Sequence, residues 1–95
     1  MLYDPERTID MTLDEAIAAV EATLDSPYLR VDRRQAREDS TSYLLIVLDT
    51  SGGRRDDGGP VANGPRLVAK ASGEVRRLTV PDAVARAERM ALVRR

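Results

Sequence analysis

The run "YLLIVL", Tyr43–Leu48, is the longest unbroken apolar stretch in this chain of 95 residues. Five of its six side chains are aliphatic, and two of these are β-branched. A continuous apolar run bounded by polar residues is typical of a strand that is covered on both faces. We therefore predict that this stretch forms the central strand of a sheet and the middle of the hydrophobic core.

A helix is predicted before this strand. Thr12-Leu13-Asp14-Glu15 has the pattern of a capping box, in which the threonine side chain and Glu15 satisfy each other's backbone amides. Apolar residues then recur at three- and four-residue spacing and form one stripe, and Ser26-Pro27 is expected to end the helix. The stripe consists of Leu13, Ile17, Val20 and Leu24. Residues 1–11 are expected to form an N-terminal arm.

Two segments beside the central run are less regular. Residues 29–37 alternate loosely between apolar and charged side chains, which indicates an edge strand. Residues 49–65 read "DTSGGRRDDGGPVANGP" and contain five of the six glycines and two of the five prolines. No hydrophobic periodicity remains there, so we predict a flexible Gly-rich loop, of a length that is usually functional or mobile.

A hairpin and a second helix are predicted after that loop. Residues 66–71 and 74–78 form two short strands that Ser72-Gly73 can join through a turn with positive φ. Asn63-Gly64 upstream favours a left-handed turn. A helix then begins near Pro81, with Thr79 or Val80 as its cap. Its predicted inner stripe consists of Val80, Val84, Ala87 and Ala91, with Met90 beside it.

Together these elements predict an α+β fold in a single domain, residues 1–95. It comprises an N-terminal helix, an antiparallel sheet of three to four strands including a C-terminal hairpin, and a C-terminal helix. With 42% apolar and 33% charged residues, the composition is that of a soluble globular domain. No apolar run is long enough to cross a membrane and the first residues do not resemble a secretory signal, so we expect a cytoplasmic protein without membrane contacts.

The residue types present exclude most enzymatic machinery. Histidine and cysteine are absent, which removes the commonest general base, the best nucleophile and thiolate metal sites. Lys70 and Ser72 are better explained as a solvent-facing residue and a turn residue than as a catalytic pair. Asp56 and Asp57 do not have the spacing of an EF-hand, and no phosphate-binding glycine motif occurs. We therefore expect no enzyme activity, no cofactor and no metal.

The charge distribution argues against nucleic acid as a partner. Arginine supplies fourteen of the fifteen basic residues, but acids are interspersed among them and the net charge is −1. The only aromatic residues are Tyr3, Tyr28 and Tyr43, so platforms for stacking bases are scarce. Residues 1–25 carry a net charge of −6 and the remaining residues +5.

Three segments of the chain resemble the YrhB-like family of small bacterial domains, which are candidate immunity proteins of polymorphic toxin systems. These are "MTLDEAIAAVEATL", "SYLLIVLD" and "NGPRLVAKASGEVRRL", so the resemblance covers residues 11–78. Its most specific part has the form "GPxLVxKxxGEV", here Gly64–Val75. The resemblance implies a domain without catalysis or cofactor that acts by presenting its surface to another protein.

We therefore expect a protein-binding domain, with a toxin encoded nearby as the leading partner and either a monomer or a homodimer as the free state. A general chaperone-like or oligomeric structural module is the alternative. The charged residues of the loop and the hairpin are the predicted contacts with the partner. They are Arg54, Arg55, Asp56, Asp57, Lys70, Arg76 and Arg77.

Overall fold

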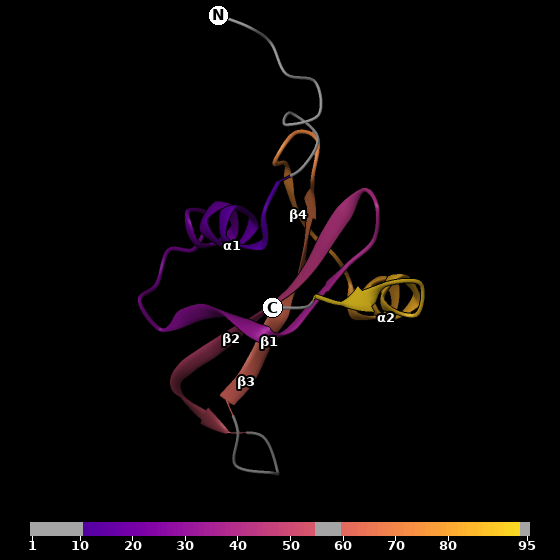
Figure 1. Cartoon of the computed structure of the whole chain (residues 1–95). Helices are drawn as coiled ribbons and strands as arrows, with labels where there is room; N and C mark the ends of the chain where they lie inside the picture. The colour runs from indigo at the N-terminus through magenta and orange to yellow at the C-terminus, as the bar shows by residue number, and fades with distance from the viewer. Residues whose placement is uncertain (1–10, 55–59, 94–95) are drawn as a thin grey trace, which may run out of the picture.

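The computed structural model describes residues 11–54 and 60–93, which form an α+β fold of two helices and one antiparallel sheet (Figure 1). The five strands are arranged in the order β4-β3-β2-β1-β5. The elements are α1 (Leu13–Glu21), β1 (Leu29–Glu38), β2 (Ser42–Arg54), β3 (Pro60–Ala69), β4 (Val75–Arg77), α2 (Val80–Ala87) and β5 (Ala91–Leu92). No helix in these described ranges has the length and apolar character needed to cross a membrane.

The run that was predicted to form the central strand lies in β2, at the middle of the sheet. Its alternate side chains face opposite sides, as the pleat of a strand requires. Tyr43, Leu45 and Val47 pack with α1, whereas Leu44 packs with α2 on the other face. Because the two helices cover opposite faces, the predicted burial on both sides is confirmed (Figure 1).

The capping box at the start of α1 is also confirmed. The Thr12 amide donates to Glu15 Oε1 at 2.8 Å, and the Glu15 amide donates to Thr12 Oγ1 at 3.2 Å. The helix buries Ile17 and Val20 against the sheet, as predicted. It ends at Glu21, earlier than Ser26-Pro27, because the following amides bond three residues back and the Thr23 hydroxyl donates to the Val20 carbonyl at 2.6 Å.

The predicted loop over residues 49–65 is corrected by the structure at residues 49–54 and 60–65, whereas residues 55–59 lie outside the described residues. β2 continues to Arg54 and β3 begins at Pro60, with Asp49 opposite Val61 and Arg54 opposite Pro60. Glycine and proline signal turns when a segment is considered alone, but here the two halves of the segment pair with each other. Tertiary pairing therefore overrides the local preference. The predicted left-handed turn at Asn63-Gly64 becomes a bulge within β3, where Gly64 has a φ of +102°.

The predicted hairpin is present, but its turn is longer than two residues. Val68 stands opposite Val75, and the Ala69 amide closes the loop by donating to the Glu74 carbonyl at 3.0 Å. Gly73 supplies the expected positive φ, at +76°. The Ser72 hydroxyl accepts from the Glu74 amide at 3.2 Å, so the serine stabilises the wider loop from within.

The second helix begins as predicted, with Thr79 accepting from the Asp82 amide, but its buried stripe differs. Ala83 is buried, whereas Val80 and Val84 are 65% and 54% exposed. Ala91, which was predicted to lie in the stripe, belongs instead to β5, which pairs with the end of β1. The fifth strand escaped prediction because two residues carry no periodic signal of their own.

A matched pair of leucine variants tests this arrangement of the core. Leu45→Ala should lower the free energy of unfolding by about 2–5 kcal/mol, because Leu45 is fully buried. Leu92→Ala should lower it by only about 1 kcal/mol, since 54% of Leu92 is exposed in the native state. Chemical denaturation measures both values, and equal losses would contradict the placement of Leu45 between the layers.

Candidate functional site: a groove beside the second helix

An open groove of about 420 Å³ lies between α2 and the sheet. We call it the α2 groove and define it by its lining residues. Its floor comes from β2 and β3 and consists of Leu44, Ile46, Ala62, Gly64 and Pro65. One wall is the α2 side chains Val80, Ala83, Val84 and Ala87. The other wall consists of Arg34, Gln35, Arg37 and Leu92.

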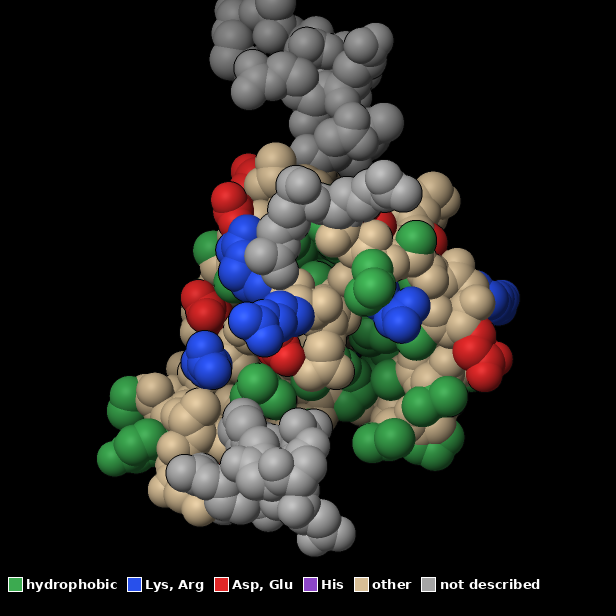
Figure 2. Space-filling model, turned by 60° about the horizontal axis from the view of Figure 1, so that its bottom comes forward, with side chains coloured by type: hydrophobic (Ala, Val, Ile, Leu, Met, Phe, Trp, Pro, Cys, Tyr) green, Lys and Arg blue, Asp and Glu red, His purple; other side chains and the backbone are tan. Residues whose placement is uncertain are grey.

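The groove is apolar and open to solvent. Figure 2 looks onto this side of the molecule and shows hydrophobic side chains lining a hollow beside α2. Val80, Val84 and Leu92 are each more than half exposed, and they converge on the hollow from α2 and β5. A cluster of large exposed apolar side chains around a depression is characteristic of an interaction site, whereas scattered ones are common on any protein.

The groove exists because α2 packs through its small side chains. Ala83, with Ala87 beside it, contacts the part of the sheet that contains Leu44 and Leu67. The larger valines of α2 lie to one side of this contact and meet no covering layer. The sheet face under α2 is thus only partly covered, unlike the opposite face, which α1 covers through Ile17 and Val20.

The bulge in β3 shapes the floor of the groove. Between Ile46 opposite Pro65 and Leu48 opposite Ala62, two β3 residues stand opposite Val47 alone. A Cβ atom on Gly64 would lie 3.3 Å from the Arg77 side chain, and the residue has a left-handed φ, so glycine fits this position best. The bulge therefore places Gly64 and Pro65 in the floor of the groove.

Arginines from β1 form the basic edge of the groove. A second bulge, in β1, leaves residues 33–36 opposite Leu45 alone and places Arg34 and Arg37 at this edge. Arg37 Nη1 donates to the Met90 carbonyl at 3.4 Å. The neighbouring Asp32 carboxylate is engaged by the Gln35 side chain at 2.6 Å and by the Arg34 amide at 3.0 Å.

A shallower hollow continues the groove toward β4. It shares Gly64, Pro65 and Val80 with the α2 groove and adds Arg77, Leu78 and Thr79. The Asn63 carbonyl there accepts from both Arg77, at 2.9 Å, and Arg66, at 3.2 Å. Burial and the adjacent Arg77 charge lower the pKa of Arg66 from its usual value. The guanidinium groups of Arg66 and Arg77 therefore share one carbonyl, and Arg77 lines the hollow.

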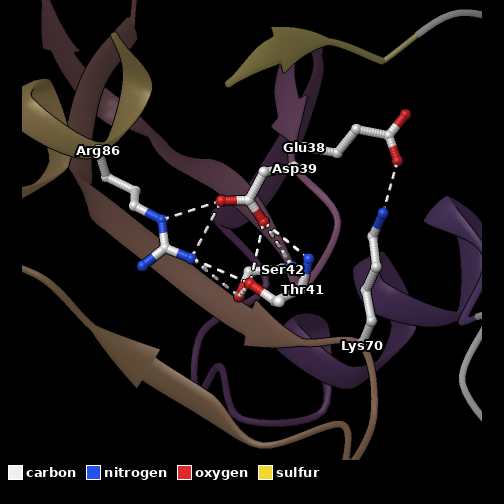
Figure 3. A network of polar contacts seen from close by, with 6 residues as sticks. All are labelled: Glu38, Asp39, Thr41, Ser42, Lys70 and Arg86. Carbon is white, nitrogen blue, oxygen red and sulfur yellow. Dashed lines mark hydrogen bonds and ion pairs between the residues drawn. The ribbon is translucent and has the colours of Figure 1, made fainter. Parts of the chain in front are cut away.

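A polar network fixes α2 against the turn between β1 and β2 (Figure 3). The Arg86 side chain donates to Asp39 Oδ2 at 3.2 Å through Nε and approaches the same oxygen at 3.1 Å through Nη2. It also reaches the hydroxyls of Thr41 and Ser42 at 3.3 Å. Asp39 in turn accepts from the amides of Thr41 and Ser42, each at 2.9 Å. The helix wall of the groove is thus held in one place.

Asp39 is the acid on which this network depends. Partial burial on its own would raise the pKa of Asp39, but hydrogen bonds from Thr41 and Ser42 and the charge of Arg86 outweigh it and lower the pKa. The native state therefore favours the ionised carboxylate more strongly than the unfolded chain does. This preference stabilises the fold at neutral pH.

The structure does not gather the predicted contact residues at one place. Lys70 donates to Glu38 at 2.8 Å, lies 4.7 Å from the centre of the Tyr43 ring and has only 14% of its side chain exposed. It is thus held on the protein surface instead of facing solvent freely. Arg76 and Arg77 are exposed on β4, and Arg77 lines the hollow beside the groove. Arg54 ends β2, and Arg55, Asp56 and Asp57 lie outside the described residues.

Sequence reasoning missed most of the groove. Arg34 and Arg37 were assigned to an exposed strand edge, and Val80 and Val84 to the buried stripe of a helix. The spacing of the two valines did indicate a common face of α2. Only the packing of Ala83 decides that this face remains open.

The side chains that line the groove can bind a ligand through apolar contacts and positive charge. Its lining side chains are aliphatic residues, one amide and two guanidinium groups, with no carboxylate, hydroxyl or thiol. Within the described residues, no group of three acidic side chains is placed to hold a metal ion. The arrangement can exclude water from an apolar ligand and attract negative charge.

Comparisons with known proteins find no match: no protein-family model and no curated protein matches this sequence, and no solved structure matches this fold.

The pH dependence of stability tests the role of Asp39. Because its folded-state pKa is lowered, its contribution is fully present above the unfolded value near 3.8 and is lost as pH falls through the folded pKa. Asp39→Asn should therefore unfold more easily than the wild type at pH 7, and the difference should shrink as the pH falls below about 3.8. Urea denaturation over a pH series measures this.

Asp25→Asn is the control for the loss of one negative charge. Asp25 is exposed and has no side-chain partner among the described residues. If both variants changed stability in the same way at every pH, the Asp39 network would not hold α2.

Proposed function

We propose that this chain is a non-catalytic protein-binding domain of the immunity type, which binds a cognate bacterial toxin and neutralises it. The observation that carries the proposal is the α2 groove, with Val80, Val84 and Leu92 exposed around an apolar floor. Because each of these side chains is little more than half exposed, covering the rest of it against a partner contributes about 1–2 kcal/mol. Among the described residues, Tyr28 is the other large apolar side chain that is exposed, and it lies outside the groove.

The contacts that hold the two walls of the groove support this proposal. Arg86 and Asp39 hold α2, and the Arg37 contact with the Met90 carbonyl joins β1 to the chain before β5. A preformed site loses little conformational entropy on binding, so more of the contact energy appears as affinity. A neutralising protein requires tight binding, because the toxin must stay bound long enough that it does not reach its target.

The resemblance to the YrhB-like domains supports the choice of a toxin as the partner. The most specific motif of that resemblance starts at Gly64 and Pro65. These two residues lie in the floor of the α2 groove and in the adjoining hollow. The motif and the groove therefore concern the same part of the molecule, although each was identified from different observations.

A chaperone-like module that shields apolar clients is the second candidate, and the exposed valines favour it to the same degree. The two functions differ in their selectivity. An immunity protein binds one partner in a defined ratio, whereas a chaperone-like module suppresses the aggregation of unrelated proteins. Salt separates them further, because charge-steered association weakens with ionic strength and purely apolar association does not.

Two glutamate variants on α2 test the proposed function. Val84→Glu should weaken binding of a toxin encoded beside the gene by at least about tenfold, because it places a charge in the apolar wall. Ala85→Glu should leave the affinity unchanged, since Ala85 is exposed on the same helix but does not line the groove. Isothermal titration calorimetry with catalytically inactive toxins measures both. The absence of a complex with any of these toxins, or equal binding by both variants, would overturn the proposal.

A further inference from the structure

We infer that the α2 groove recognises a short apolar protein segment whose two ends carry carboxylate groups. This inference rests on the proposed function and specifies the chemistry of the partner at the same site. It is carried by the distribution of charge around the groove. Arginines lie at both ends of an aliphatic surface, and no acidic side chain lines it.

The two basic ends lie on different strands. Arg34 and Arg37 belong to β1, and Arg77 belongs to β4. The groove and its shallower continuation share Gly64, Pro65 and Val80, so one continuous surface runs between these ends across β2 and β3. A ligand in this position crosses the strands of the sheet and passes Val80 of α2, which lines both hollows.

These arginines are available to a ligand. In the ranges 11–54 and 60–93, carboxylates pair with Arg33, Lys70 and Arg86, but not with the three arginines at the ends of the groove. Arg37 and Arg77 donate to backbone carbonyls, which leaves their charge uncompensated. Asp32, the acid beside the β1 end, already accepts from Gln35 and from the Arg34 amide.

The length of the surface sets the size of the ligand. Neighbouring strands lie about 4.8 Å apart, so β1 and β4 are separated by roughly 14 Å. An extended chain rises about 3.3 Å per residue, so about four residues span that distance. We therefore expect two acidic residues about four positions apart in an extended ligand, with about three aliphatic residues between them, so that both acidic side chains point to the same face.

A nucleic acid fits this surface less well than a protein segment. The lining of the groove has no aromatic side chain on which a base could stack, and its floor is aliphatic. Carboxylates match the planar guanidinium groups and can each accept two hydrogen bonds from one arginine. Aliphatic side chains match Ile46, Val80 and Val84.

A pair of synthetic peptides tests the inference directly. The probes are acetyl-Asp-Leu-Val-Leu-Asp-amide and the same peptide with lysine in place of both aspartates. Each is titrated into the isotopically labelled full chain, and amide chemical shifts are followed by NMR. We expect the acidic peptide to shift the amides of Val80, Val84 and Leu92 and to bind at least about tenfold more tightly than the basic one at low salt, with the ratio falling as salt is added.

A charge reversal at the edge of the groove provides a second readout. Arg34→Glu should lower the affinity for the acidic peptide and raise the affinity for the basic one. Arg30→Glu should change neither affinity. Both arginines are exposed on β1, but only Arg34 lines the groove. The spectrum of each variant also reports whether it is folded. A gain of affinity for the basic peptide cannot result from unfolding. The reversed preference therefore distinguishes a loss of charge recognition from a loss of structure.

The possible outcomes separate this inference from the proposed function. Equal affinities of the two peptides, no binding, or shifts confined to another surface would overturn the inference. If Val84→Glu still abolished toxin binding in that case, the proposed function would stand without it. If the acidic peptide bound in the groove while no toxin did, the inference would hold and the immunity function would fall.

Discussion

The structure depends on the burial of one strand on both faces. β2 lies at the middle of the sheet, and its alternating side chains contribute to two separate clusters, one with α1 and one with α2. Leu45 and Val47 are fully buried on the α1 side, and Leu44 anchors the other side. In so small a domain, with no cysteine for disulfides, this layering is the main source of stability.

The two faces of the sheet are covered unequally, and this inequality creates the site. On one face, α1 fills the space with Ile17 and Val20. On the other, α2 makes its contact through Ala83 and is fixed by Arg86 at the turn between β1 and β2. Its valines therefore remain beside an open floor. A polar interaction at one end of the helix thus maintains an apolar opening along its side.

Features that are made within a few residues of sequence were predicted correctly, and features that depend on pairing between distant segments were not. The capping box at Thr12 and the cap at Thr79 were predicted correctly, because each is made within three residues of sequence. The strands within the segment 49–65 were not predicted, because they are stabilised by pairing with each other. Local composition does not report such pairing. The basic edge of the groove was missed because Arg34 owes its position to a bulge in β1 that only the register with β2 defines.

The sequence by itself determined the α+β class, the central strand, the hairpin, the helix starts and the absence of histidine and cysteine chemistry. These properties follow from residue identity and from short-range periodicity, which act within a few positions of the chain. Only the tertiary structure decided that Val80 and Val84 face a groove, that Lys70 is held by Glu38, and that Arg34 and Arg77 lie at opposite ends of one surface. Each of these depends on how far-separated elements approach one another, and packing between layers, not local preference, sets that approach.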